Sequence, residues 1–167
     1  MDLLLESGHR RVGILGANFD CAQISYSRFL GCQESFESHG LSLDASWTEA
    51  CRYSMAEGYA AAGRILDRTE GLTALFALSD VMAIGAIRCL RDRGLRVPED
   101  ISVVGFDGVA LGEYCVPRLT TVRQDTRSMV HRAAEILLSR LTEELPPVHE
   151  TIPFTLIPGE SAGPSPI

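Results

Sequence analysis

Residues 73–85 read TALFALSDVMAIG: an apolar run, two polar residues, and the start of a helical pattern that continues to residue 92. An apolar run without alternation predicts a strand that is buried on both of its faces. Buried strands of this kind are typical of parallel sheets that are covered by helices on both sides. This stretch therefore predicts a central strand and the following helix of an α/β fold, with Ser79-Asp80 at their junction.

Buried strands and helices alternate in the same way on either side of this stretch. Further apolar runs lie at 12–15 and 101–106, and helical patterns cover 22–38 and 56–67. Residues 41–47 alternate between apolar and polar side chains, which predicts a strand near a sheet edge. Together these segments predict a three-layer α/β fold, in which a doubly wound, mostly parallel sheet carries helices on both faces.

The alternation changes in the last third of the chain. A short β-prone segment at 119–122 precedes an amphipathic helix over 126–141, and a last strand follows at 152–157. Pro153 within that strand predicts an edge position, because proline cannot donate a ladder hydrogen bond. The apolar stripe of the helix is formed by Met129, Ala133, Ile136, Leu137 and Leu141.

The two ends of the chain also carry signals. Leu3-Leu4-Leu5-Glu6 followed by Ser7-Gly8 is typical of the last turns of a helix, and a helix this short does not form alone. We therefore expect that the sequence begins inside a longer natural chain. Residues 161–167 lack any periodic pattern and are expected to fray.

Composition and charge exclude several classes of function for this segment. The chain has 167 residues, of which 15 are basic and 22 acidic, and its formal net charge is −7. Nucleic-acid backbones are bound through clustered positive charge, so this segment is not expected to hold DNA itself. No apolar run approaches the roughly 18 residues that span a bilayer. Five cysteines without a CxxC pair and the lack of a signal peptide favour the cytoplasm, and no metal or other cofactor is expected.

Polar or aromatic residues follow the predicted strands at their carboxyl ends, where open parallel sheets bind ligands. These residues are Asn18, Phe19, Asp20, Thr48, Glu49, Arg52, Tyr53, Ser79, Asp80, Asp107 and Gly108. Carboxylates accept hydrogen bonds from hydroxyl groups, and an aromatic ring can cover the apolar face of a pyranose. The pattern therefore suits a sugar or another polyol.

Each candidate also has a purely structural interpretation. Ser79 fits the N-cap of the helix that follows it, and Asp107-Gly108 fits a simple turn. Arg28 fits either a solvated surface position or a position in the ligand cleft. Tyr53 taken alone favours packing, and Gln124 carries no signal by itself.

Five segments together resemble the LacI/GalR family of bacterial transcriptional regulators. They are GHRRVG (8–13), RFLG (28–31), TALFALSDVMAIG (73–85), GLRVPEDISVVGFD (94–107) and PRLTTV (117–122). The resemblance covers about residues 3–161 and is carried above all by the run VPEDISVVGFD.

The resemblance implies a helix-turn-helix headpiece and a two-lobed effector domain that is similar to periplasmic binding proteins of type I. Residues 1–124 and 150–163 would form the C-terminal lobe, and residues 125–149 would cross to the N-terminal lobe. The headpiece and most of the N-terminal lobe would lie outside this sequence. Without its partner lobe, the helix over 126–141 is expected to pack on its own lobe, to pack on a neighbouring copy, or to be poorly ordered.

The resemblance also implies the residues that contact the effector. They are Arg28, Tyr53, Ser79, Asp80, Asp107 and Gln124. Three positions depart from the family pattern: Ser79 replaces the usual asparagine, Gly108 stands where a second aspartate is common, and Gly159 stands where the last strand usually carries arginine. The serine alters the hydrogen bonding expected at position 79, Gly108 loosens the prediction of ligand class, and Gly159 is expected to weaken an anchoring contact of the last strand.

The implied mechanism is linkage between two sites. A small molecule, a sugar or a related polar metabolite, would bind between the lobes and change the affinity of the headpiece for operator DNA. The protein is expected to be a repressor and a homodimer. Candidate dimer contacts are Met82, Arg88, Leu111, Tyr114 and Val116, with ordinary core packing as the alternative.

The main alternative is a periplasmic sugar-binding protein of a transporter, which shares the fold and the polar rim. The unpaired cysteines, the missing signal peptide and the VPEDISVVGFD run favour the regulator. Enzyme function is not expected, because Gly13-Ile14-Leu15-Gly16 is neither a dinucleotide-binding motif nor a P-loop and no GxSxG sequence is present.

Overall fold

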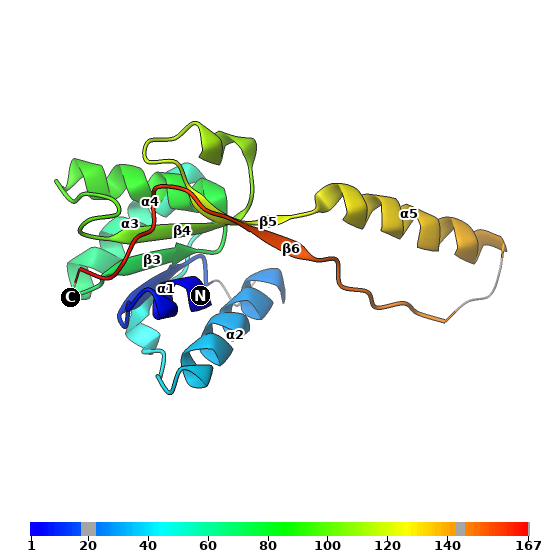
Figure 1. Ribbon diagram of the computed structural model, residues 1–167, viewed down its shortest axis with the longest axis horizontal. Helices are drawn as coiled ribbons and strands as arrows, with labels where there is room; N and C mark the ends of the chain where they lie inside the picture. The colour runs from blue at the N-terminus through cyan, green and yellow to red at the C-terminus, as the bar shows by residue number, and fades with distance from the viewer. Residues whose placement is uncertain (18–22, 143–145, 167) are drawn as a thin grey trace.

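A computed structural model describes residues 1–17, 23–142 and 146–166 of the chain (Figure 1). The helices are α1 (Asp2–Glu6), α2 (Gln23–Ser38), α3 (Met55–Arg68), α4 (Asp80–Asp92) and α5 (Thr126–Thr142), with short 3-10 helices η1 (Ala45–Trp47) and η2 (Ala110–Glu113). The strands are β1 (Val12–Leu15), β2 (Thr48–Glu49), β3 (Ala74–Ala77), β4 (Ser102–Asp107), β5 (Thr120–Gln124) and β6 (Phe154–Ile157). These strands form one sheet in the order β2-β1-β3-β4-β5-β6.

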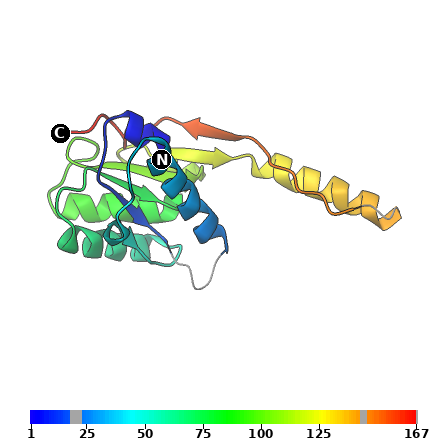
Figure 2. The ribbon, with the colours of Figure 1, turned by 90° about the horizontal axis from the view of Figure 1, so that it is seen from below.

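The sheet is parallel from β2 to β5, and only β6 runs antiparallel to its neighbour. Helices α3 and α4 cover one face, and α1 and α2 lie on the other (Figures 1 and 2). The prediction of a three-layer, doubly wound, mostly parallel α/β fold is confirmed. The edge position predicted for the last strand is also confirmed, although Pro153 lies just before β6 and not within it.

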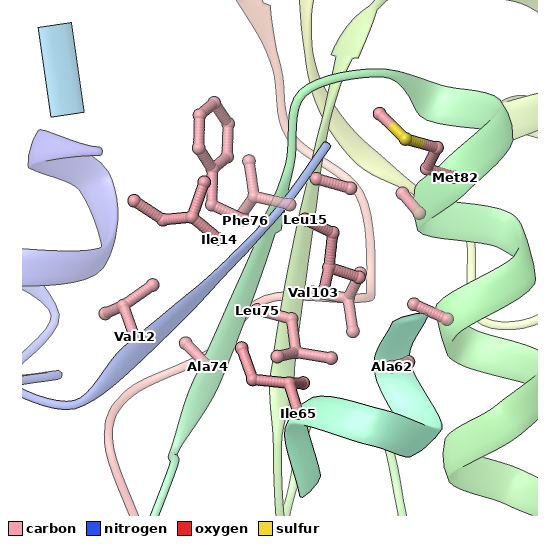
Figure 3. Packing of buried hydrophobic residues seen from close by; sticks show 14 of the residues in the cluster. Val12, Ile14, Leu15, Ala62, Ile65, Ala74, Leu75, Phe76, Met82 and Val103 are labelled. Atoms are coloured by element: carbon pink, nitrogen blue, oxygen red, sulfur yellow. The ribbon is translucent and has the colours of Figure 1, made fainter. Parts of the chain in front are cut away.

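The core explains why the apolar runs predicted buried strands. Every residue of β1 and β3 is buried, so side chains on both faces of these strands contact helices. Figure 3 shows Ile65 of α3 beside Leu75 of β3, while Ile14 and Phe76 lie together on the opposite face of the sheet. Burial of apolar surface on both faces of the central strands holds the three layers together.

The strand expected over 41–47 is wrong, because the sheet gains only the two residues of β2 in this region. Asp44 instead caps η1, and its side chain accepts a hydrogen bond from the Ser46 amide at 2.8 Å. The Trp47 ring packs against Phe36 of α2, with ring centroids 6.3 Å apart. The apolar side chains thus alternate along a turn that packs on α2.

The fraying expected for residues 161–167 is wrong for the described residues 161–166; Ile167 lies outside them. Ser161 is fully buried. Its hydroxyl donates to the Val103 carbonyl at 2.6 Å and accepts from the Thr120 amide at 2.8 Å. Further along, the Ser165 amide donates to the Ser7 carbonyl at 2.9 Å. The tail is fixed because it supplies hydrogen-bond partners that β4 and β5 lack at this end.

Helix α5 lies apart from the layered sheet, at the end of an arm formed by β5 and β6 (Figures 1 and 2). None of its residues is buried. Leu137 and Leu141 on its apolar stripe are 63% and 74% exposed. Packing of this helix on its own lobe, one of the three expected outcomes, is therefore wrong.

Among the described residues, no helix combines the length and the apolar character that a membrane-spanning segment requires.

Candidate functional site

The strand order places a ligand crevice at one edge of the sheet. The chain runs from β1 to β2 on one side and then crosses back past β1 to β3 on the other side, and such a reversal opens a crevice at the carboxyl ends of the strands. Leu78 and Ser79 follow β3 at this edge, while Asp107 ends β4 and Gln124 ends β5. The expected rim residues Asn18, Phe19 and Asp20 lie outside the described residues.

Asp107 is the centre of the site. Its Oδ1 atom accepts hydrogen bonds from Arg28 Nη2 at 3.0 Å and from Gln124 Nε2 at 2.9 Å. Its Oδ2 atom accepts one from Ser79 Oγ at 2.9 Å. The Arg28 and Asp107 side chains are 15% and 29% exposed, so the ion pair is shielded and still reachable from solvent. The structure thus joins four of the six expected site residues, and we call Arg28, Ser79, Asp107 and Gln124 the site cluster.

Phe106 is a residue of the site that sequence reasoning missed. The Arg28 guanidinium carbon lies 4.0 Å from the centroid of the Phe106 ring, which is a cation–π contact. Arg28 Nη1 also donates to the Leu78 carbonyl. The guanidinium is therefore fixed by an aromatic face, a carbonyl and a carboxylate, which excludes the solvated surface position for Arg28.

Arg28 and Phe106 also border an open, mainly apolar pocket of about 510 Å³. Its other walls come from α1, α2 and the strands β3, β5 and β6. Arg28 is therefore the residue of the site cluster that also borders this apolar pocket.

The backbone at Asp107 is strained. Its φ angle is 120°, and it is the one non-glycine residue with positive φ in the part of the chain that the structure describes. Gly108 follows with φ 75°, and a Cβ atom there would lie 2.5 Å from the Cβ of Arg123. A second aspartate at position 108 would not fit this turn. Backbone strain of this kind clusters at ligand sites, so Asp107-Gly108 is a turn and also part of the site.

Ser79 does not use its side chain as a helix cap. It occupies the N-cap position of α4, but its hydroxyl makes no capping hydrogen bond and donates to Asp107 instead. The alternative in which Ser79 merely caps the helix is wrong for its side chain.

Asp80, the first residue of α4, is fully buried. Its Oδ2 atom accepts from the Val109 amide at 2.7 Å, and its Oδ1 atom accepts from the Thr121 hydroxyl at 2.5 Å. Burial raises the pKa of Asp80, and the hydrogen bonds from Thr121 and from the Val109 and Gly108 amides act in the opposite direction. The carboxylate faces protein donors rather than solvent.

Tyr53 is separate from the site cluster. Its hydroxyl lies 2.9 Å from Ser25 Oγ, so the ring is tied to the first turns of α2, and 41% of the residue is exposed. Among the described residues, no hydrogen bond links Tyr53 to Asp107.

The candidate dimer contacts divide into two groups. Met82 is fully buried and its sulfur accepts from Cys51 Sγ, so the expectation that Met82 meets a partner subunit is wrong. Leu111, Tyr114 and Val116 are 47%, 81% and 71% exposed, which excludes core packing for these three. Arg88 is exposed and pairs with Asp92 on its own helix.

The thiols and other ligating groups form no metal site in the described part of the chain, where no three His, Cys, Asp or Glu side chains come together. Cys32, Cys51, Cys89 and Cys115 are free thiols, and Cys21 lies outside the described residues. Burial raises the pKa of Cys32 to about 12, which keeps this thiol protonated and unreactive.

Comparison with known proteins decides the family. The family model of the periplasmic binding protein-like domain matches residues 1–162. The HTH-type transcriptional repressor PurR of Haemophilus influenzae is 36% identical over 141 residues, which are 84% of this chain and 42% of that protein. This chain belongs to the LacI/GalR family. It forms a periplasmic binding protein-like effector domain of that family.

Solved structures of LacI/GalR regulators have the same fold. The transcriptional regulator CelR in complex with cellobiose superimposes with a TM-score of 0.91 at 34% identity, over 96% of this chain and 49% of CelR. A sugar-binding LacI-family regulator from Escherichia coli, complexed with phosphate, superimposes with a TM-score of 0.88 at 30% identity, over 97% of this chain and 58% of that one. These relatives are regulators, so the transporter alternative is not favoured. The chain spans less than half the length of the curated relative PurR.

Proposed function

We propose that this domain senses a small polar molecule, in the first place a sugar, for a DNA-binding transcriptional repressor. The observation that carries this proposal is the convergence of Arg28, Ser79 and Gln124 on Asp107 at the carboxyl edge of the sheet. Three donors that fix one carboxylate prepare it to accept hydroxyl groups in a defined geometry. Such preorganisation lowers the entropy cost of binding.

Charge and shape at the site favour an uncharged ligand. Arg28 and Asp107 form an ion pair, so the positive charge is already matched before any ligand arrives. A phosphate or carboxylate would have to compete with Asp107 for Arg28. Hydroxyl groups can instead donate to Asp107 while an apolar sugar face lies against the nearby apolar surface.

The exposed α5 supports a second lobe. We propose that residues 1–124 and 150–163 form one lobe and that residues 125–149 belong to the other, as the family resemblance implies. Uncovered leucines on α5 favour burial against such a lobe, because exposed apolar patches mark interaction surfaces. A ligand between the lobes would favour one arrangement of them and change operator affinity by a coupling free energy of about 1–3 kcal/mol.

The remaining partners follow from the same family. DNA contacts would come from a helix-turn-helix headpiece, which fits a sensing segment whose net charge is −7. We propose a homodimer that acts in the bacterial cytoplasm and uses the exposed surface around Leu111, Tyr114 and Val116.

A ligand screen on the full-length protein tests the proposal. Sugars, polyols and nucleobases are compared for their ability to raise the melting temperature, since a ligand that binds only the folded state stabilises it. Arg28→Ala and Asp107→Ala should each abolish the shift, whereas Glu37→Ala, at an exposed position near the end of α2, should retain it. A shift that survives in both site variants would reject this site.

A further inference from the structure

A second hydrogen-bonded cluster adjoins the site cluster at the start of α4, where Asp80 follows Ser79. It consists of the Asp80 carboxylate, the Thr121 hydroxyl and the Val109 amide, and we call it the buried cluster. Asp80 is fully inaccessible and Thr121 is 4% exposed. A carboxylate in this position accepts hydrogen bonds from protein groups only.

The two clusters connect the same three parts of the fold. In the site cluster, Asp107 joins the start of α4 through Ser79 and the end of β5 through Gln124. In the buried cluster, Asp80 at the start of α4 binds Thr121 of β5 and the amide of Val109, two residues beyond Asp107. Any shift of the turn after β4 would therefore break contacts in both clusters.

The Asp80 carboxylate packs closely against Gly105 of β4. A Cβ atom on Gly105 of β4 would lie 2.2 Å from Asp80 Oδ1, so the carboxylate fills the space that a larger residue on β4 would need. Beyond this contact the chain adopts the positive φ angles of Asp107 and Gly108. An L-residue in that conformation is unfavourable and persists only where its surroundings fix it.

We infer that Asp80 is a positioning residue, which holds the strained Asp107-Gly108 turn through the Val109 amide and so sets the geometry of the site cluster without touching the ligand. This inference rests on the proposed function for its meaning in ligand binding, but the positioning itself is a property of the free protein. The role differs from the direct effector contact that the family resemblance implied for Asp80.

Amide hydrogen exchange on the ligand-free full-length protein tests the positioning role. Asp80→Ala should speed exchange at residues 107–109 by at least about tenfold, because a hydrogen bond to a charged acceptor is lost there. Amides in the interior of β4 and in α4 should keep their protection. Asp80→Asn should restore slow exchange, since its amide oxygen can accept from Val109 and its NH2 group can donate to Thr121 Oγ1.

Two further comparisons make the outcome decisive. Asp92→Ala removes an exposed carboxylate from the other end of α4 and should leave residues 107–109 unchanged. If Asp80→Ala does not fold, two substitutions of Thr121 replace it. Thr121→Val removes the hydroxyl and should speed amide exchange in the turn at 107–109, whereas Thr121→Ser keeps the hydroxyl and should not. The inference is overturned if exchange at 107–109 is unchanged, or if it rises equally throughout the domain. No ligand is added, so this result is independent of the ligand screen.

Discussion

Gly85 of α4 lies so close to Met55 of α3 that a Cβ atom on Gly85 would come within 2.0 Å of the Met55 carbonyl oxygen. Gly58 makes the reciprocal approach, and its Cβ would lie 2.3 Å from the Met82 carbonyl oxygen. The two helices therefore meet backbone to backbone. Because α4 begins with Ser79 as its N-cap and Asp80 as its first residue, this contact sets where the site residues lie.

Gly85→Ala should lower the free energy of unfolding by about 1–3 kcal/mol, because the added methyl group meets backbone that cannot move aside. Gly31→Ala is the matched control, since Gly31 lies exposed in α2 and a Cβ there would contact nothing within 4 Å. The control should gain about 0.5–1 kcal/mol from the better helix propensity of alanine. Urea denaturation measures the free energy of unfolding of both variants. Equal stability of Gly85→Ala and Gly31→Ala would contradict the close backbone contact between α3 and α4.

Gly159 stands where the family pattern has an arginine, and the chain packs closely around it. A Cβ on Gly159 would lie 2.4 Å from the Arg118 carbonyl oxygen, and the Gly159 amide donates to Thr120 Oγ1 at 3.0 Å. The segment that follows β6 is thus anchored here by a backbone amide and by close backbone packing. Gly159→Ala should cost about 1–3 kcal/mol in thermal or urea unfolding.

Gly163→Ala provides the comparison within the same tail, because its Cβ would make only an ordinary contact of 3.4 Å with Pro98. Its effect should stay within about 0.5 kcal/mol. If Gly159→Ala lowers the free energy of unfolding no more than Gly163→Ala does, the backbone contact between Gly159 and Arg118 is contradicted.

Tyr114→Glu should dissociate the proposed homodimer. Tyr114 is 81% exposed beside Leu111 and Val116, so a charge there meets an apolar partner surface without disturbing the core. Sedimentation velocity over a range of concentrations should show a monomer, and the melting temperature at high concentration should fall only by the loss of association. Ser38→Glu adds the same charge on exposed α2 and should leave the dimer intact. A wild-type protein that sediments as a monomer would refute the dimer.

Much of the fold could be predicted because buried parallel strands leave an unambiguous pattern. The apolar run at 12–15 became β1 with no change of bounds, since all four of its residues are buried. The alternating segment at 41–47 misled because a half-exposed turn that packs on α2 has the same pattern as an edge strand. Periodicity reports which side chains are buried and does not report which backbone partner they have.

The candidate site could be located from topology but not resolved atom by atom. Asp80 and Asp107 both follow buried strands, and nothing in their sequence neighbourhood distinguishes the buried carboxylate from the accessible one. The distinction depends on the space above Gly105, which only the packed structure defines. Phe106 was missed because its contact with Arg28 joins β4 to α2, which are distant in sequence. The sequence signal that could have identified Phe106 is its position directly before Asp107.

A pH-dependent loss of stability should originate at His9, on the sheet edge opposite the site. His9 is fully buried, and its Nδ1 and Nε2 atoms lie 2.8 Å from Thr73 Oγ1 and 3.1 Å from the Gly163 carbonyl. The carbonyl can only accept, so Nε2 carries the proton and Nδ1 accepts from Thr73. Burial lowers the pKa of His9 below 6.5, and the hydrogen bond to Gly163 opposes this effect.

The direction of this pH effect on stability follows from proton binding. Because the pKa of His9 is lower in the folded protein, the unfolded chain binds the proton more readily, and acid favours unfolding. The contribution of His9 to stability is therefore fully present above pH 6.5, the ordinary pKa of histidine, and is lost as the pH falls through the lowered pKa. Urea denaturation from about pH 7.5 to about pH 5 measures the effect. The free energy of unfolding should fall with the pH in the wild type and should depend less on pH in His9→Gln. Asp80, whose raised pKa has the opposite sign, is common to both proteins and cancels in the difference between them. His131→Gln removes an exposed histidine of α5 and should keep the pH dependence of the wild type. If stability in His131→Gln depends on pH as little as in His9→Gln, His9 is not the source of the effect.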